Sequence, residues 1–316
     1  VGGGVQDLQE NYRKPYKSHG MNKLWSDKKN INKIIEEFTI GQDAELDVKI
    51  AAYDIYGSMA HAIMLMERDI ISRSDARQIL DQLRQLILQV QKGEFRIEEG
   101  VEDVHSQIEL ILTREIGEPG KKLHTSRSRN DQILVDLKMF YRDFLHQVGK
   151  KLEGLIDKFL RKSDLHQDVL MPGYTHMQVA MPSSFGLWFG AYGEALIHDY
   201  ALVRSVLEII NHNPLGSAAG YGTSFPINRR RTTELLGFTD LEYNVVSASM
   251  NRGKSEFFIA NAMAGVCVTL ARFSMDVCQY NSQNYGFVRL PEEYTTGSSI
   301  MPHKKNTDVF ELLRAR

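Results

Sequence analysis

The sequence predicts an all-α protein, a bundle of long helices preceded by a smaller helical domain. Two observations carry this prediction. Apolar residues recur every three or four positions over three unusually long stretches, and runs that alternate apolar and polar residues, as strands do, are scarce. A helix of this length with one apolar stripe needs partners, because the stripe can be buried only against other helices.

The chain has 316 residues, which favours about two domains. We expect residues 1–20 to be a tail or cloning remnant, residues 21–108 to form the amino-terminal helical domain and residues 109–316 to form the central bundle. The final letters, VFELLRAR, have helical periodicity and no stop signal. We therefore expect a further carboxy-terminal part after Arg316.

The predicted helices follow one another with short breaks. One helix runs from Ser74, placed to cap it, to Gly93, placed to stop it. A second pattern continues from Val104 and ends at the GEPG of residues 117–120. The third long helix alternates its apolar residues by four and three, the seam of nearly parallel helices. The three long stripes are Ile133–Phe159, Phe185–Ile210 and Ile259–Tyr280.

Composition and charge exclude several classes of partner. The net charge is −2, with 38 basic and 40 acidic residues, so no global field favours nucleic acid or a membrane surface. The longest apolar run, AMAGVCVTLA, is too short to cross a bilayer, and the amino end has no hydrophobic signal core. We expect neither nucleic acid nor a membrane as a partner, and any anion recognition to be local.

The two cysteines predict a reducing compartment such as the cytoplasm. Cys267 and Cys278 lie on one predicted helix, about 16 Å apart from the helical rise. That separation is beyond the reach of a disulfide. We expect both to be small buried hydrophobic residues.

Chemically capable residues gather at the breaks between the long helices. The segment KKLHTSRSRNDQ (121–132) combines two arginines with hydroxyl and amide side chains at a helix start, which suits a carboxylate ligand. The same residues also suit a plain capped helix start, because Thr125, Ser126 and Asn130 are capping types. Both interpretations stay open on composition alone.

Two further breaks are less specific. In MPGYTHMQVAMP (171–182), His176 is suited to act as an acid or base near neutral pH, although a lone loop histidine is commonly a hydrogen-bonding surface residue. The glycine-rich segment 211–231 would let backbone approach a ligand. It lacks a GxxxxGK[ST] phosphate loop, so its ligand role stays open.

The segment YTTGSSIMPHKKNTD (294–308) is unusual for a connector. Ser298 and Ser299 precede Lys304, Lys305, Asn306 and a new helix start, and such groups would hold a negative charge and favour an ionised serine. The small residues around Gly297 suit a loop that closes over a substrate. The alternative is a mobile surface loop with solvated lysines.

Metal and triad-hydrolase chemistry find little support in the sequence. Glu102, Asp103 and His105 share one helical turn, but Asp103 and His105 point apart and no second cluster has metal-ligand spacing. We therefore predict no metal site. The ingredients of a Ser–His–Asp hydrolase occur, but the G-x-S-x-G elbow does not.

The three polar loops, TSRSRND, GYTHMQ and GSSIMPHKKN, resemble the signatures of the fumarase/aspartase superfamily. Within it, LHTSRSRNDQ, EDVHSQIE, YDIYGSMAHAIML and NPLGSAAGYGTSFPINR are similar, in the same order, to segments of the argininosuccinate lyases and the related lens delta-crystallins. The likeness runs from Leu24 to the end. It implies a homotetramer whose sites are each shared by three subunits, a small-molecule substrate, and no metal or organic cofactor.

The resemblance also implies reversible β-elimination of argininosuccinate to arginine and fumarate. By motif, Ser298 is the base and His176 the acid, or the reverse, with Glu311 orienting His176. Lys304 matches a carboxylate-binding position of the family, and we count it with the catalytic residues. Six further residues match substrate-binding positions: Ser128, Arg129, Asn130, Thr175, His303 and Asn306.

The chain departs from the family pattern at three positions. Many relatives have glutamine where this chain has His303, and proline where it has Thr307. Gly41 stands where the family has a substrate-contacting serine, so Gln42 or Asp43 would have to replace that contact. His303 favours adenylosuccinate lyase as an alternative enzyme. A crystallin-like structural protein that has lost activity is the alternative from another class.

Overall fold

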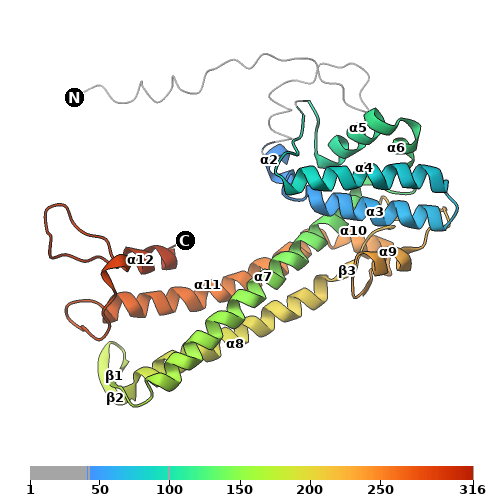
Figure 1. Ribbon diagram of the computed structural model, residues 1–316. Helices are drawn as coiled ribbons and strands as arrows, with labels where there is room; N and C mark the ends of the chain where they lie inside the picture. The colour runs from blue at the N-terminus through green and yellow to red at the C-terminus, as the bar shows by residue number, and fades with distance from the viewer. Residues whose placement is uncertain (1–40, 42, 99, 316) are drawn as a thin grey trace, which may run out of the picture. The chain divides into compact units, whose positions relative to one another are not determined.

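The computed structural model describes residue 41, residues 43–98 and residues 100–315, and its main feature is α-helix, as predicted (Figure 1). The chain divides into two compact units, the first ending at Thr125 and the second running from Ser126 to Arg316. A boundary at residue 108 would cut helix α5 (Val104–Ile116), which packs on α3 and α4 within the first unit. The predicted tail, residues 1–20, lies outside the described residues.

The first unit is built on two paired helices. Helix α4 is capped by Ser72, whose hydroxyl accepts a hydrogen bond from the Asp75 N–H at 3.1 Å, rather than by Ser74. Ser72 has the extended backbone that an N-cap requires, whereas Ser74 already lies within the helix. Gly93, at φ +70°, follows the end of α4, as expected. The described helices of this unit are α2 (Asp43–Asp47), α3 (Ala51–Glu67), α4 (Arg73–Gln91), α5 and α6 (Glu118–Lys122).

Helix α4 buries one stripe and exposes the other face. Ile79, Leu83 and Leu86 have no exposed surface, while Leu88, two residues after Leu86, is 48% exposed. The stripe follows the three-to-four spacing of the sequence, which is why α4 was predictable.

Leu86→Ala is expected to lower the free energy of unfolding by about 2–5 kcal/mol, because it leaves a cavity in a packed core. Leu88→Ala removes the same atoms from the exposed face, and we expect less than about 0.5 kcal/mol from it. Urea denaturation followed by circular dichroism measures both. Equal losses for the two variants would contradict the burial assigned to this stripe.

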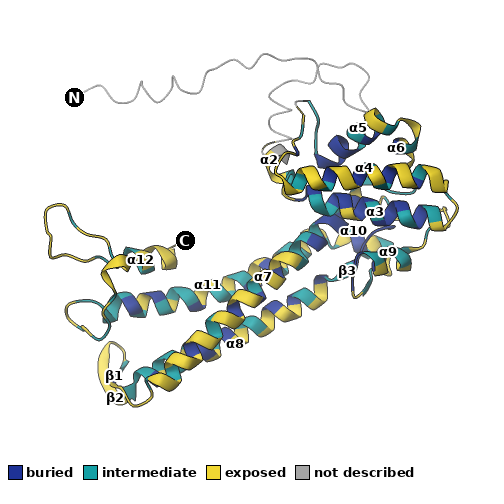
Figure 2. Ribbon diagram, in the orientation of Figure 1, coloured by how far each residue is buried: buried dark blue, intermediate teal, exposed yellow. Residues whose placement is uncertain are grey.

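The second unit is organised by three long helices, α7 (Arg129–Leu165), α8 (Phe185–Ile210) and α11 (Lys254–Tyr280). Helix α8 runs back along α7, and α11 lies against α8 (Figure 1). Buried residues form a stripe along each helix, and the opposite faces stay exposed (Figure 2). The buried core of this unit consists of Leu145, Leu152, Phe159, Leu196, Val203, Val206, Ile210, Ile259 and Ala262.

Aromatic rings fill the core where the three helices meet. The ring of Phe159, 4% exposed, packs against Phe189, Tyr192 and Phe273, whose centroids lie 4.9–6.2 Å away. Helices α7 and α8 approach closely at Gly186, where a Cβ atom would lie 2.6 Å from the carbonyl oxygen of Ser163 on α7. A side chain at Gly186 would therefore push these two helices apart.

Shorter elements connect the long helices. The structure has a two-stranded antiparallel hairpin, β1 (Leu170–Thr175) and β2 (Gln178–Ser184), where only a break between helices was expected. Its prolines and glycine hid the strand pattern in the sequence. The other described elements are β3 (His212–Asn213), α9 (Arg229–Leu235), β4 (Asp240–Leu241), which is parallel to β3, α10 (Val245–Met250), a 3₁₀ turn (Glu292–Tyr294) and α12 (Asp308–Ala315).

Helix α11 differs from the sequence-based expectations about its apolar length and about the burial of its cysteines. Among the described helices, it alone is long and apolar enough to cross a membrane by length and composition, a weak criterion that core helices of soluble proteins also meet. Cys267, on this helix, is exposed rather than buried, because it lies on the outward face, while Cys278 is half-buried. Most of α11 is not buried within this chain.

Candidate active site

His176 lies at the tip of the β1–β2 hairpin. Thr175 pairs with Gln178, so His176 and Met177 form a two-residue turn, and both have positive φ (+51° and +62°). This is the pattern of a type I′ turn, which usually takes Asn-Gly. A non-glycine residue in the left-handed region is disfavoured by about 1–2 kcal/mol. The turn therefore presents an exposed imidazole on a strained and well-defined backbone.

Tyr174 anchors this hairpin. Its ring packs edge-on against Tyr285, with centroids 5.6 Å apart, and contacts Phe287 at 6.3 Å. Tyr285 in turn accepts a hydrogen bond from Gln279 Nε2 at 2.9 Å, at the end of α11. The hairpin that carries His176 is thus held to the carboxy-terminal end of α11 by aromatic contacts that the sequence analysis did not identify.

Asp276, a half-buried carboxylate on α11, ties this helix to aromatic side chains of α8. Asp276 accepts hydrogen bonds from Trp188 Nε1 at 2.9 Å and from the Tyr192 hydroxyl at 2.6 Å. Burial, followed by the hydrogen bond to Asp276, raises the pKa of Tyr192 well above its ordinary value. Tyr192 therefore stays a protonated donor at any working pH.

Ser298 lies on a loop with a closed neck. Thr296 and Asn306 form an isolated antiparallel bridge, with N···O distances of 3.2 Å and 2.8 Å, and residues 297–305 run between them. Such a compact loop with adjacent ends is an Ω-loop, a common carrier of functional groups. Ser298 is half-buried on it, and His303 and Lys304 are exposed. The loop is thus more defined than a freely mobile connector.

The start of α12 was expected to help hold the negative charge of an ionised serine, but acidic side chains already occupy it. Its first turn already contains Asp308 and Glu311, and Thr296 donates its hydroxyl to Asp308 at 2.5 Å. Lys305 forms an ion pair with Glu292, with Nζ 3.5 Å from Oε1. Among the residues that the structure describes, none forms an ion pair with Lys304, so Lys304 remains the loop's available cation.

Thr307 has a specific role in place of the usual proline. Its side chain is 9% exposed, and its hydroxyl donates to Glu311 Oε1 at 2.8 Å. Proline at this position could not make that bond. Glu311 is held by its own helix in this chain, and its contact with His176 stays a prediction.

Ser128 caps helix α7, so the capped-start interpretation of segment 121–132 holds for this residue. Its side chain accepts from the Asn130 N–H at 3.2 Å, and the Ser128 N–H donates to Asp131 Oδ1 at 2.9 Å, completing a capping box. The S-x-x-D spacing could have indicated Asp131 from sequence. Arg129 is half-buried and Asn130 is exposed, so the side chain of Asn130 stays accessible to a ligand.

The predicted site residues fall into two groups at opposite ends of α7. Ser128, Arg129 and Asn130 lie at its start, while the hairpin follows its end after four residues. A helix of 37 residues is about 55 Å long. The hairpin and the Ser298 loop lie at the end of the bundle away from the start of α7 (Figure 1). One chain therefore cannot bring all the predicted residues into one site.

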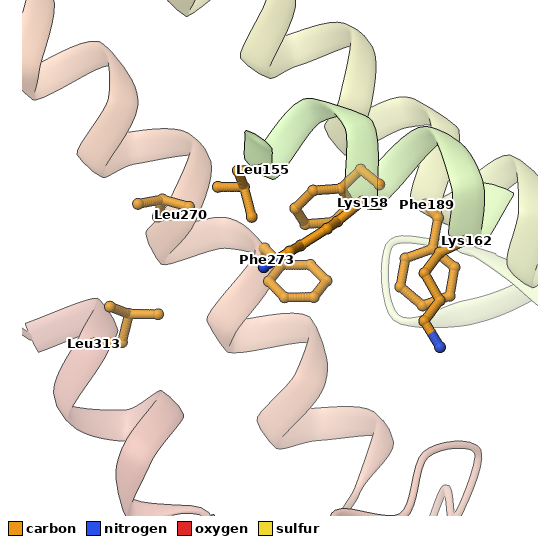
Figure 3. A pocket seen from close by; sticks show the side chains of 8 residues that line it. Leu155, Lys158, Lys162, Phe189, Leu270, Phe273 and Leu313 are labelled. Carbon is orange, nitrogen blue, oxygen red and sulfur yellow. The ribbon is translucent and has the colours of Figure 1, made fainter. Parts of the chain in front are cut away.

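A cavity in the second unit does not contain the predicted catalytic and substrate-binding residues. It has a volume of about 430 Å³ and lies between α7, α8, α11 and α12 (Figure 3). None of the predicted catalytic or substrate-binding residues lines it. Its lining consists of Leu155, Lys158, Phe159, Lys162, Phe189, Leu270, Phe273 and Leu313.

The backbone conformation at position 41 disfavours serine. Gly41 has φ +54°, a conformation that glycine adopts more readily than serine. Of the two residues expected to replace the serine contact, Gln42 lies outside the described residues. Asp43 begins α2.

The profile of a family described as lyase matches residues 26–316. The chain belongs to the lyase family. Argininosuccinate lyase of Parabacteroides distasonis is 54% identical over 294 residues, which are 93% of this chain and 66% of that protein. Argininosuccinate lyase of Thermotoga neapolitana is 37% identical, over 93% of this chain and 74% of that protein.

Solved structures agree on the fold of this lyase-family chain. An EDDS lyase variant with bound fumarate has a TM-score of 0.75 at 30% identity, over 90% of this chain and 56% of that one. A class II fumarase from Schistosoma mansoni has a TM-score of 0.73 at 20% identity, over 89% and 68%, and shows the fold alone. These likenesses confirm the predicted fumarase/aspartase-type bundle. The chain spans just under two thirds of the length of the Parabacteroides relative.

Proposed function

We propose that the whole protein is an argininosuccinate lyase of arginine biosynthesis, acting in the cytoplasm. The supporting observation is the 54% identity to argininosuccinate lyase, which extends over 93% of the chain. The match to the lyase family, residues 26–316, includes all three polar loops. The EDDS lyase relative holds fumarate, the product expected here. His303 alone favours adenylosuccinate lyase as a second candidate.

The proposed reaction is a β-elimination. Ser298, ionised to its alkoxide, takes a proton from the carbon next to a succinyl carboxylate and becomes a neutral hydroxyl, and the electron pair of the broken C–H bond moves into that carboxylate to give a dianion. His176 gives a proton to the guanidino nitrogen as its bond to carbon breaks, which releases arginine and fumarate. Lys304 and Asn306 bind the succinyl carboxylates, with His303 beside them on the loop. Ser128, Asn130 and Thr175 add donors, and Arg129 supports the first loop.

A fumarate assay tests this proposal. The whole protein is given argininosuccinate and adenylosuccinate separately, and ultraviolet absorbance follows product formation. We expect turnover with argininosuccinate. Turnover with adenylosuccinate alone would support the second candidate, and binding without turnover would favour a crystallin-like structural protein.

The proposal includes a homotetramer with sites shared by three subunits. The length of α7, about 55 Å, supports this, because it separates the two groups of predicted site residues within one chain. Large apolar side chains are also exposed on the long helices, including Leu187 and Ile197 on α8 and Phe257, Val268 and Met275 on α11. Faces of this kind are usually covered in an assembly.

Val268→Asp is expected to reduce the mass of the assembled protein, because a carboxylate would be buried in the proposed interface between subunits. Val268 is 54% exposed in this chain. Leu88→Asp, at 48% exposure on the first unit, is the matched control and should leave the mass unchanged. Light scattering coupled to gel filtration measures both. A tetramer that tolerates Val268→Asp would place the interface elsewhere.

A further inference from the structure

The glycine-rich turn, residues 214–222, receives a buried carboxylate. Gly216 and Ala218 have φ of +89° and +52° on either side of Ser217. Their two N–H groups both donate to Asp131 Oδ2, at 2.8 Å and 2.9 Å. Backbone of this alternating kind forms a concave nest that binds anions. The occupant of this nest is a side chain of the protein itself.

The same carboxylate holds the start of α7. Asp131 Oδ1 accepts the Ser128 N–H, so its two oxygens together accept three backbone hydrogen bonds. Asp131 has no exposed surface. Carboxylates that accept several backbone hydrogen bonds away from water are strongly fixed in place. The position of residues 128–130 is therefore set by a turn some 85 residues later in the chain.

The turn that receives Asp131 is itself rigid. Arg229 donates to the carbonyls of Leu215 and Glu242 at 3.0 Å and 2.9 Å. A Cβ atom on Gly216 would lie 2.7 Å from Cγ of Arg229, so both the positive φ and the close approach require glycine there. The glycines thus serve a close contact within the protein.

We propose that Asp131 is a positioning residue for substrate. It holds Ser128, Arg129 and Asn130 in the arrangement that binds a succinyl carboxylate, and the glycine-rich turn exists to fix Asp131. This inference rests on the proposed function. Asp131 touches no substrate in this account, and it acts through the donors at the start of α7.

Asp131→Asn tests the inference, because the amide keeps the size of the carboxylate but turns one acceptor into a donor. In the whole protein we expect about a tenfold rise in the inhibition constant of fumarate and in KM for argininosuccinate. Helicity and assembled mass should stay unchanged. Ser72→Ala is the control for losing a helix-cap acceptor on another helix, α4, that makes no contact with Asp131, and it should leave both constants unchanged. A lower unfolding midpoint with an unchanged fumarate constant would overturn the inference.

A second measurement needs no substitution and serves if Asp131→Asn does not fold. Coupling between two sites is reciprocal, so saturating fumarate should slow hydrogen exchange in peptides covering residues 214–222 as well as residues 126–132 of the wild-type protein. Protection of 126–132 alone would overturn the inference and leave the proposed function intact. A whole protein that neither binds fumarate nor forms it would overturn the proposed function, and this inference with it.

Discussion

Alanine in place of Ser298 is expected to lower kcat for argininosuccinate cleavage by about two to four orders of magnitude, the usual contribution of a positioned acid or base. The substitution removes only the side-chain oxygen that, in the proposed mechanism, takes the proton as an alkoxide. Lys304 on the same loop is assigned to binding a succinyl carboxylate in the proposed mechanism, so it does not replace Ser298 as the base. The initial rate of fumarate formation by the whole protein measures the effect.

The fold should survive this substitution. The neck of the loop is closed by backbone bonds between Thr296 and Asn306, which Ser298 does not make. Ser299→Ala is the matched control, since it removes the same group one residue later from an exposed side chain. We expect near wild-type turnover from Ser299→Ala. If Ser298→Ala also kept near wild-type turnover, Ser298 would not be the base.

The roles of Ser298 and His176 can be separated by exchange of the carbon-bound hydrogen. In deuterated water the base variant should lose both exchange and cleavage. A variant of the acid, His176→Asn, should lose cleavage and retain exchange, because the proton can still be removed while the leaving nitrogen is not protonated. The reverse pattern would assign His176 as the base.

The long helices of this protein were readable from the sequence because each buries a continuous stripe. Phe159 and Leu196 fall on the predicted stripes and are 4% and 0% exposed. Burial against a neighbouring helix imposes the spacing of three and four, so the pattern carries the structure. The predicted stop at Gly93 also held, since its positive φ suits glycine.

The local structure of the loops was less predictable. The β1–β2 hairpin was missed because Pro172 and Pro182, which are paired across it, argue against strands in any sequence pattern. The nest around Asp131 was missed because it depends on backbone φ values at Gly216 and Ala218. Letters such as GSA do not specify those values, and only a three-dimensional contact identifies the carboxylate that the turn receives.

The sequence indicated candidate site residues one by one, but not how these residues are arranged in space. His176 and Ser298 were singled out by chemistry and by family resemblance, and the structure shows where each lies. The chain leaves all ten predicted site residues exposed or half-buried and separates them into two groups. In the proposed tetramer the contacts that bring these groups together lie between chains, and a single sequence carries no direct record of such contacts.

Mixed tetramers of two inactive variants are therefore expected to recover activity. Asn130→Ala removes a carboxylate donor at the start of α7, and loss of such a donor costs about 10²–10³-fold in turnover. His176→Asn lies at the other end, about 55 Å away along the same helix. If each site takes these residues from different chains, random mixing of equal amounts leaves about a quarter of the sites intact. Coexpression followed by the fumarate assay measures this recovery.

A pair of variants on one element gives the control. Thr175→Ala and His176→Asn both lie on the β1–β2 hairpin, so every hairpin in their mixture carries one defect and no site is intact. The mixture should then be no more active than the mean of its two components. Recovery in this control would show that the assay does not report on intact sites. Failure of Asn130→Ala and His176→Asn to complement, in tetramers shown to contain both chains, would place both residues of each site on one chain and contradict the shared site.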